Sequence, residues 1–354
     1  MALLHVLYWT LRYALPNVFA ASTPLVVEDL AHIHIHDHAP KYSHDYDHTN
    51  IHDLPPPAFN QAYMSVSALE AGLVDLPSLL TVSDATPNEI HTVPSLAFLL
   101  THSQSGKRIV FDLGLRRDTE AYAPYVQMMI DKWMPVTVPQ NVEESLRMGG
   151  LEASEVETVV LSHLHFDHIG DPSPFTNATF LVGADAKPQI TNGYPINPTA
   201  SETTTCLPLS RTNFLPHSLF DISIGPFPHA YDFFGDGSLY IIDAPGHNAG
   251  HINILTRTSE TGGWIYLAGD SAHDVRLLTG EREVAEVEQG GSGQKLCLHG
   301  DKKSAETHIR RVGELMKRKR NDVHVLIAHD WEWYEKEKKT GGKAFWPGVI
   351  PAMA

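Results

Sequence analysis

Three histidines and an aspartate with metal-ligand spacing fall in the segment 162–168, which reads SHLHFDH. Alternate side chains of an extended segment point the same way, so His163 and His165 can bind one ion together. The chain must then turn, which lets Asp167 and His168 face a second ion. Imidazole and carboxylate groups suit Zn²⁺ or a related ion better than Ca²⁺ or Mg²⁺. Packing alone gives no reason for this cluster, because buried polar groups are costly unless they are paired.

Three later segments also place a histidine or an aspartate directly after an apolar stretch. These side chains are His247 and His251 in APGHNAGH after residues 239–243, Asp270 in AGD after residues 264–267, and His329 in AHD after the stretch that begins at Val323. Each position taken singly carries little weight, but all of them occupy equivalent places. Strand ends at one edge of a sheet converge, so we expect these groups to join the first cluster in one site.

The segments that position these groups are expected to be strands. Apolar and β-branched runs predict a strand, and a run such as 156–161 is typical of a buried one. The expected strands cover residues 62–68, 96–102, 108–113, 156–161, 179–182, 239–243, 252–256, 264–267 and 323–328. Because strand runs in both halves of the chain are followed by helices, the pattern predicts a layered α/β sandwich.

Two helices and one long loop are predicted among these strands. Asn141 and Glu144 resemble a capping box at the start of a short helix. Ser304 is expected to cap a helix over residues 305–320, whose apolar face carries Ile309, Val312, Leu315 and Met316. Residues 186–220 are dominated by Pro, Asn, Thr and Ser, which predicts a loop or a lid.

Residues 1–57 are expected to form an amino-terminal extension, and residues 58–354 a catalytic domain. The apolar start of the chain is too interrupted to span a bilayer, and no Lys or Arg precedes it, so we expect a surface helix rather than a secretory signal. A cytoplasmic location follows from this expectation. Residues 31–53 hold seven histidines. Such a tract can collect metal, but alternating histidines on a flexible segment fix no coordination geometry, which favours an irregular solvated arm.

Composition excludes several classes of partner. Lys plus Arg number 26 and Asp plus Glu number 42, so the formal net charge is −16. Such a surface repels phosphate backbones and anionic lipids, and we expect neither a nucleic acid nor a membrane as partner. Cys206 and Cys297 are too few for a disulfide framework, and neither lies in a Cys-His motif that would indicate a thiol nucleophile.

In these motifs the chain resembles the metallo-β-lactamase superfamily, and within it the dinuclear-zinc N-acyl-homoserine lactonases. The strings SHLHFDHIG, APGHNAGH, AGD and AHD stand in family order across about residues 60–340. The resemblance implies a four-layer αββα sandwich and two Zn²⁺ or related divalent ions per chain. The implied ligands are His163, His165 and His247 for the first ion, Asp167, His168 and His329 for the second, and Asp270 as a bridge to both.

The same resemblance implies roles for residues around the ligands. Asp112 matches an early structural aspartate of the family, and His251 falls outside the ligand set as a supporting or structural residue. The best-known lactonases carry a Tyr three residues after the bridging Asp, where this chain has His273. His273 can donate a hydrogen bond to a substrate carbonyl, or it can point away from the site. Asp167 is expected to accept or shuttle a proton, because it lies beside the nucleophile.

The implied reaction is the attack of a metal-bound hydroxide on the carbonyl of a lactone or related carboxylic ester. We expect a small-molecule substrate with an apolar part, because aromatic and methionine side chains near the site can form an apolar wall. Ordinary core packing is the alternative role for each of them. These side chains are Tyr122, Tyr125, Met128, Met129, Trp133, Met134, Trp331, Trp333 and Tyr334.

Other functions remain as alternatives. A thioesterase, of the glyoxalase II kind or one that releases polyketides, is the second enzyme hypothesis. Glyoxalase II needs a cationic pocket for glutathione, whereas the basic residues of the helix over 305–320 more simply form a solvated face. A zinc β-lactamase is disfavoured by the Asp167–His168 pair, a nuclease by the charge, and a flavo-diiron oxidoreductase by His165. A non-catalytic metal-binding protein is disfavoured because a complete ligand set is costly to leave unpaired.

Overall fold

The computed structural model describes residues 53–86, 88–288, 295–317 and 323–352. The expected amino-terminal helix and nearly all of the histidine-rich tract lie outside these residues. The last residues of the expected extension pack on the domain that follows. Leu54 is buried in an apolar cluster, and the Arg257 guanidinium donates hydrogen bonds to the carbonyls of Pro55 and Pro56 over 2.6 and 3.1 Å.

Six strands form the first sheet, in the order β1-β4-β5-β7-β8-β9. They are β1 (Met64–Leu69), β4 (Ala97–His102), β5 (Arg108–Phe111), β7 (Thr158–Val160), β8 (Thr179–Gly183) and β9 (Thr212–Leu215). The first three strands pair antiparallel, and β5, β7, β8 and β9 run parallel. The central strand β7 is short and apolar, and it leads directly into the SHLHFDH segment.

The second sheet also has six strands, in the order β10-β11-β12-β13-β14-β17. They are β10 (Ile222–Ile224), β11 (Phe227–Asp232), β12 (Leu239–Asp243), β13 (Ile252–Arg257), β14 (Trp264–Leu267) and β17 (Val323–Leu326). All neighbours pair antiparallel except β14 and β17, which run parallel. The parallel pair brings the ends of β14 and β17 to the same side of the sheet.

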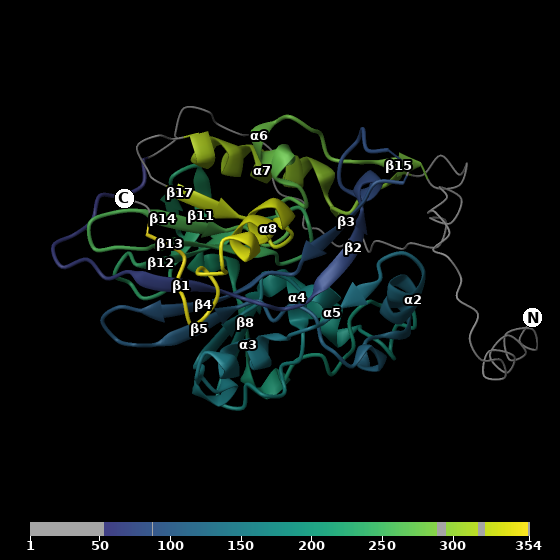
Figure 1. Cartoon of the computed structure of the whole chain (residues 1–354), viewed down its shortest axis with the longest axis horizontal. Coiled ribbons are helices and arrows are strands. Elements are labelled where there is room, and N and C mark those ends of the chain that lie inside the picture. The colour runs from purple at the N-terminus through teal and green to yellow at the C-terminus, as the bar shows by residue number, and fades with distance from the viewer. Residues whose placement is uncertain (1–52, 87, 289–294, 318–322, 353–354) are drawn as a thin grey trace, which may run out of the picture.

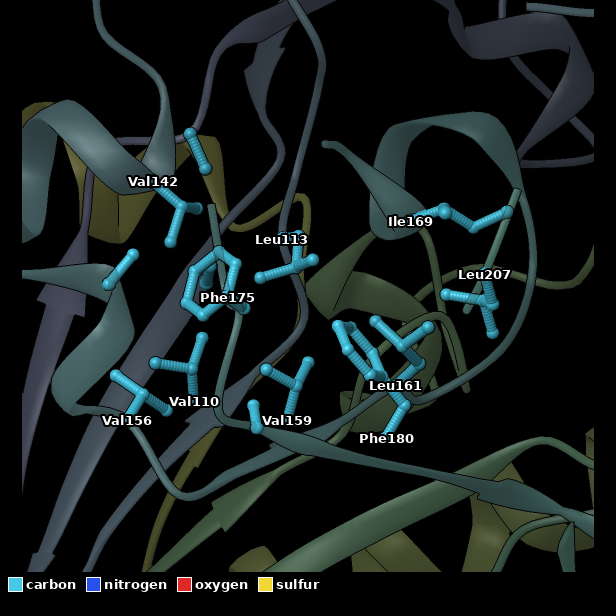
Figure 2. Packing of buried hydrophobic residues seen from close by; sticks show 14 of the residues in the cluster. Val110, Leu113, Val142, Val156, Val159, Leu161, Ile169, Phe175, Phe180 and Leu207 are labelled. Atoms are coloured by element: carbon cyan, nitrogen blue, oxygen red, sulfur yellow. The ribbon is translucent and has the colours of Figure 1, made fainter. Parts of the chain in front are cut away.

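The two sheets stack face to face between helices (Figure 1). One apolar cluster fills the space between the sheets. A second cluster packs α3 (Val142–Met148) on the outer face of the first sheet, and Figure 2 shows Val142 above Val110 and Phe175 there. A third packs α6 (Val275–Thr279) and α7 (Lys302–Lys317) on the outer face of the second sheet. The predicted four-layer αββα sandwich is confirmed.

Smaller elements surround the two sheets. A three-stranded sheet and α2 share an apolar cluster with Phe166 of the SHLHFDH segment. The remaining elements are β2 (Leu73–Pro77), β3 (Ile90–Pro94), β6 (Val136–Thr137), α2 (Pro124–Lys132), α4 (Phe166–Ile169), α5 (Lys187–Thr191), β15 (Val287–Glu288), β16 (Lys295–Leu296) and α8 (Trp331–Lys339).

The expected helix starts have different outcomes. The capping box at Asn141 is confirmed, because the Asn141 side chain accepts from the Glu144 amide and the Glu144 carboxylate accepts from the Asn141 amide. The expected cap at Ser304 is wrong, since α7 already begins at Lys302. The side chain of Asp301 accepts hydrogen bonds from the amide and the hydroxyl of Ser304 over 3.1 and 2.7 Å. Asp301 is itself a favourable capping residue, and it lies closer to the helix start.

The expected loop over residues 186–220 is only partly irregular. It contains the short helix α5 and the edge strand β9, which pairs parallel with β8. The sequence pattern hides β9 because the strand is four residues long, lies between two prolines and is partly exposed. Within the four described stretches of the chain, no helix combines the length and the apolar character needed to cross a membrane.

Candidate metal centre

The SHLHFDH segment leaves β7 and folds into one turn of helix. His163 is buried, His165 immediately precedes α4, and Asp167 and His168 lie on that helix. The helix ends at Gly170, which has a φ of +52° and lies so close to Leu113 that a Cβ atom would stand 2.3 Å from the Leu113 carbonyl oxygen. Only glycine fits this close approach and this backbone conformation. The turn therefore fixes the backbone that carries these four polar side chains.

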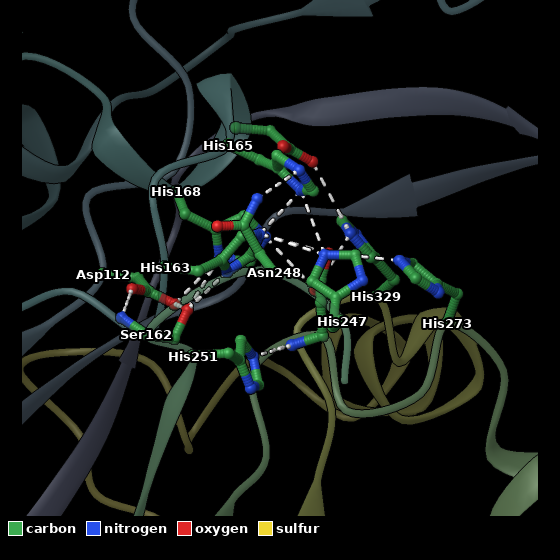
Figure 3. Close-up of polar contacts among 12 residues, drawn as sticks. Asp112, Ser162, His163, His165, His168, His247, Asn248, His251, His273 and His329 are labelled. Atoms are coloured by element: carbon green, nitrogen blue, oxygen red, sulfur yellow. Dashed lines mark hydrogen bonds and ion pairs between the residues drawn. The ribbon is translucent and has the colours of Figure 1, made fainter. Parts of the chain in front are cut away.

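Three imidazole nitrogens converge at the first candidate ion site (Figure 3). Nε2 of His163 lies 2.9 Å from Nδ1 of His165. Nε2 of His247, from the loop after β12, lies 3.2 Å from the first of these atoms and 3.0 Å from the second. Ligand atoms on a tetrahedral zinc ion, with bonds of ~2.0–2.1 Å, are ~3.3 Å apart. The triangle of nitrogens therefore fits a single cation.

The protonation of these rings agrees with that fit. Burial lowers the pKa of His163 and of His247 well below the ordinary value for histidine. Burial also lowers the pKa of His165 to about 4. All three rings are thus neutral near pH 7, and the neutral imidazole is the form that binds metal.

Asp167, His168 and His329 form a second group. Nε2 of His329, which follows β17, lies 3.5 Å from a carboxylate oxygen of Asp167. Nε2 of His168 lies 3.2 Å from Oδ1 of Asp270, yet neither of these buried atoms has a hydrogen-bond partner among the described residues. Buried polar atoms are nearly always satisfied, so this donor set fits a cation bound between them.

Asp270, at the end of β14, lies between the two groups. Its Oδ1 atom is 3.2 Å from His168 Nε2 and 3.3 Å from His329 Nε2. Its Oδ2 atom is 3.5 Å from His247 Nε2 and 3.8 Å from His163 Nε2. Burial disfavours the charged carboxylate, but the surrounding imidazoles outweigh burial and keep the pKa of Asp270 well below its usual range. One carboxylate thus presents one oxygen to each group.

Hydrogen bonds outside the two groups fix the orientation of the rings. Asp112 has a φ of +61°, and its carboxylate accepts from the Ser162 amide over 2.6 Å, from the Ser162 hydroxyl over 2.7 Å and from His168 Nδ1 over 2.9 Å. His329 Nδ1 donates to the Pro94 carbonyl over 2.8 Å. With their Nδ1 atoms engaged, both rings direct Nε2 toward Asp270.

His251 supports the backbone of the same aspartate. Its Nδ1 atom donates to the Ala244 carbonyl over 3.1 Å, and its Nε2 atom accepts from the Asp270 amide over 3.2 Å. Burial lowers the pKa of His251 to about 3, so the ring remains a neutral acceptor. His251 therefore holds the backbone of Asp270 in place, and both of its ring nitrogens are used by backbone groups.

His273 points into the site. Its Nε2 atom lies 3.3 Å from Oδ2 of Asp270, and its ring is parallel to that of His329 at 5.9 Å between centroids. His273 also lines the cavity in front of the two groups. Of the two orientations left open by the sequence, the structure has the inward one.

The structure brings all seven expected ligands together, but not at one edge of one sheet as expected. The SHLHFDH residues follow β7 of the first sheet, whereas His247, Asp270 and His329 follow strands of the second sheet. The two stacked sheets end at the same side of the sandwich, so their loops meet there. The expected convergence of strand ends is therefore found between the two sheets of the αββα sandwich, not along one edge of a single sheet.

Two contacting residues were missed by sequence reasoning. His299 Nδ1 lies 3.3 Å from His247 Nδ1, and Asn248 Nδ2 lies 2.9 Å from His165 Nε2. Asn248 directly follows His247 in the string APGHNAGH, which is a usable signal. His299 stands alone between irregular segments, and no motif marks it.

The cavity in front of the site has one apolar wall. Of the expected apolar side chains, Tyr125, Met129 and Met134 line it, together with Val74 and Leu76 of β2. The others do not line it. Tyr122 and Trp133 are buried, Trp331 stacks on His91 at 4.7 Å, Trp333 and Tyr334 pack against the core between the sheets, and Met128 lies outside the lining. Core packing, the alternative role, describes most of these residues.

Comparison with known proteins agrees with this architecture. Residues 92–184 match the model of the metallo-beta-lactamase superfamily. A gamma-lactamase of Gibberella moniliformis, MBL2, is 36% identical over 174 residues, which cover 47% of this chain and 70% of that protein. The chain belongs to the metallo-β-lactamase superfamily. The family predicted from the motifs is confirmed.

This metallo-β-lactamase chain is also similar to a longer curated protein and to a solved hydrolase structure. The monooxygenase mpaDE′ of Penicillium brevicompactum is 31% identical over 301 residues, 78% of this chain, and the chain spans only 35% of that protein's length. The solved structure of an N-acyl homoserine lactone hydrolase, with N-hexanoyl-L-homoserine bound at its metal centre, superposes with a TM-score of 0.58 at 20% identity. The superposition covers 81% of this chain and 98% of the hydrolase.

Proposed function

We propose that this protein is a dinuclear metal-dependent hydrolase that opens a lactone or a related carboxylic ester. The observation that carries the proposal is the position of Asp270, whose two oxygens face two separate groups of imidazole and carboxylate atoms. A bridging carboxylate between two ligand groups is the arrangement that holds two ions side by side. The cavity in front of Asp270 leaves room for a substrate.

Zinc is the proposed metal, because five imidazoles and two carboxylates form a donor set that suits Zn²⁺. We propose His163, His165 and His247 for the first ion, Asp167, His168 and His329 for the second, and Asp270 for both. When bound, the ions would polarise the substrate carbonyl and lower the pKa of the attacking water toward about 7.

The remaining steps belong to side chains of this chain. Asp167 lines the cavity and is placed to accept a proton from the attacking water. His273 lies beside Oδ2 of Asp270 and is placed to donate a hydrogen bond to the substrate carbonyl or to the leaving oxygen. The apolar wall with Tyr125 and Met129 would bind an acyl chain or an aromatic ring.

A cyclic amide is a second candidate substrate. Two relatives at 32% and 36% identity are named gamma-lactamases, whereas relatives named N-acyl homoserine lactonases are 26% and 28% identical. A γ-lactam has the same ring size as a γ-lactone and a carbonyl at the same position, with an N–H group in place of the ring oxygen. A glutathione thioester fits less well, because no lysine or arginine lines the cavity in the described part of the chain.

The test is a matched panel of substrates offered to the zinc-loaded full chain. The panel holds a lactone, the lactam of the same ring, a linear ester, a thioester and a β-lactam, with chelator-treated protein as control. We expect two zinc ions per chain and the fastest turnover with the lactone. Fastest turnover with the lactam would select the second candidate. Two bound ions without turnover of any compound would contradict the proposal and support a non-catalytic metal-binding protein.

A further inference from the structure

A buried glutamate lines the cavity, and the proposed reaction does not use it. Glu202 lines the same cavity as His165 and Asp270, and it is only 6% exposed. Its backbone carbonyl accepts from the Tyr194 amide over 2.8 Å, which closes a loop of the segment 187–202. Glu202 therefore belongs to an anchored part of the cavity wall.

The surroundings of Glu202 contain too few donors. The Ser201 hydroxyl donates to one carboxylate oxygen over 3.0 Å, the backbone amide of Glu202 also donates to the group, and no other described side chain bonds to it. A carboxylate has about four acceptor sites. Burial raises the pKa of Glu202 to about 7. Burial of the Cys206 thiol, together with the nearby charge of Glu202, raises the pKa of Cys206 to about 12. A buried acceptor in this state gains free energy from any donor that enters the cavity.

The two walls of the cavity differ in chemistry. The wall formed by β2 and α2 presents aliphatic, thioether and aromatic groups. The wall formed by the segment 187–202 presents amide, hydroxyl and carboxyl groups, namely Gln189, Asn192, Asn197, Ser201 and Glu202. A molecule that fits both walls would have one apolar edge and one polar edge.

We propose that Glu202 is a specificity-determining residue, whose carboxyl accepts a hydrogen bond from a hydroxyl or amino group on the substrate edge that faces the segment 187–202. This inference rests on the proposed function, because it assumes that the carbonyl of the same molecule lies beside Asp270. A substrate without the donor leaves the carboxyl unpaired, and sites built around such a bond reject the analogue that lacks it.

The first test compares dihydrocoumarins that carry a hydroxyl, an aminomethyl or a methoxy group at each free aromatic position. Zinc-loaded wild-type protein, Glu202→Leu, Glu202→Gln and the control Glu260→Leu are compared; Glu260 is exposed between β13 and β14. We expect one donor-bearing isomer to exceed its methoxy partner in kcat/KM by about tenfold or more, as a hydrogen bond to a charged group gives. The ratio should fall to near one in Glu202→Leu and remain unchanged in Glu260→Leu.

Glu202→Gln separates the two donor types. It keeps an acceptor and loses the charge, so it should retain part of a preference for hydroxyl and lose a preference for the cationic aminomethyl group. The variant also guards against a folding defect in Glu202→Leu, because Gln has nearly the same shape as Glu.

The second test measures binding without turnover. The matching 2-tetralones have a methylene in place of the ring oxygen, so they cannot be opened, and their Kd values are measured by calorimetry on the same four proteins. Equal affinity of the wild type for donor and methoxy tetralones at every position would overturn the inference, as would a preference that survives in Glu202→Leu. Donor preference among tetralones without hydrolysis of any dihydrocoumarin would instead overturn the proposed function alone.

Discussion

His299 contacts the back of His247, with 3.3 Å between the two Nδ1 atoms and the rings nearly perpendicular at 81°. The other nitrogen of His247 faces His163 and His165. A neutral imidazole carries one proton, so a His247 ring that gives Nε2 to a metal must donate from Nδ1. Burial lowers the pKa of His299 well below its ordinary value, which keeps this ring able to accept. His299 therefore selects the form of His247 that binds metal.

The change His299→Ala should weaken binding of the first ion by about 10- to 100-fold, the usual effect of removing a partner of a ligating histidine. Competition with a zinc chelator measures this. His299→Gln retains an acceptor and should recover part of the affinity. The control is His229→Ala, at an exposed position of β11. Unchanged zinc affinity in His299→Ala would show that the contact is only packing.

The change Asp112→Asn should mainly affect the second ion. Its carboxylate accepts three hydrogen bonds from Ser162 and His168, and an amide nitrogen would face at least one of those donors. We expect His168 to lose its orientation and the affinity for one ion to fall by about 10- to 100-fold. Elemental analysis after dialysis should find about one zinc per chain, as a single lost site requires. Two retained ions would contradict the supporting role of Asp112.

The change His273→Phe should lower kcat without removing metal. His273 faces Asp270 from the cavity side, and loss of one hydrogen-bond donor to a developing charge lowers turnover by about 10²- to 10³-fold. Zinc content should stay near that of the wild type. His273→Gln keeps a donor and should recover part of the rate. If kcat is the same in all three proteins, His273 does not contact the reacting carbonyl.

The carboxyl of Glu202 predicts a pH dependence of stability. Its pKa is raised by burial from 4.5 to about 7, so the folded state binds more protons than the unfolded state between these two values. Stability contributed by this group is present at low pH and is lost as the pH rises toward 7, by about 3 kcal/mol in total. Glu202→Gln lacks this loss. The free energy of unfolding of metal-free Glu202→Gln minus that of the metal-free wild type should be larger at pH 8 than at pH 5. Urea unfolding of both proteins at the two pH values measures this difference.

The opposite sign would show that Glu202 is stabilised as a carboxylate in the folded protein. Equal differences at the two pH values would show that its pKa is ordinary. Either result identifies the state of Glu202, because the two proteins differ only at this residue. The contribution of the other titrating groups to the free energy of unfolding therefore cancels in the difference between the two proteins.

The sequence predicts the parts of the site that are local in the chain. SHLHFDH follows a buried strand, and its spacing alone brings His163 and His165 to one side. Asp270 and His329 could be placed because each ends an apolar run. His299 could not be placed from the sequence, because it contacts His247 about 50 positions away. Glu202 could not be placed either, because its position depends on the shape of the cavity.

The same distinction holds for the fold. Buried strands such as β7 and β14 are marked by uninterrupted apolar runs. The edge strand β9 and the helix α2 have mixed exposure, and only their neighbours in space stabilise them. Strand ends could be recognised as converging, but assignment of each strand to one of two sheets depends on pairing partners that the chain order does not give.

Each of the two ligand groups combines both sheets, because the first sheet supplies two side chains to each group and the second sheet supplies His247 to one and His329 to the other. Neither half of the chain can assemble either group alone. The ligands of the first group all precede β17, whereas the second group is completed only by His329, which follows that strand. A chain truncated before β17 would therefore lack a ligand of the second ion only, so the two ions would differ in how much of the fold each one requires.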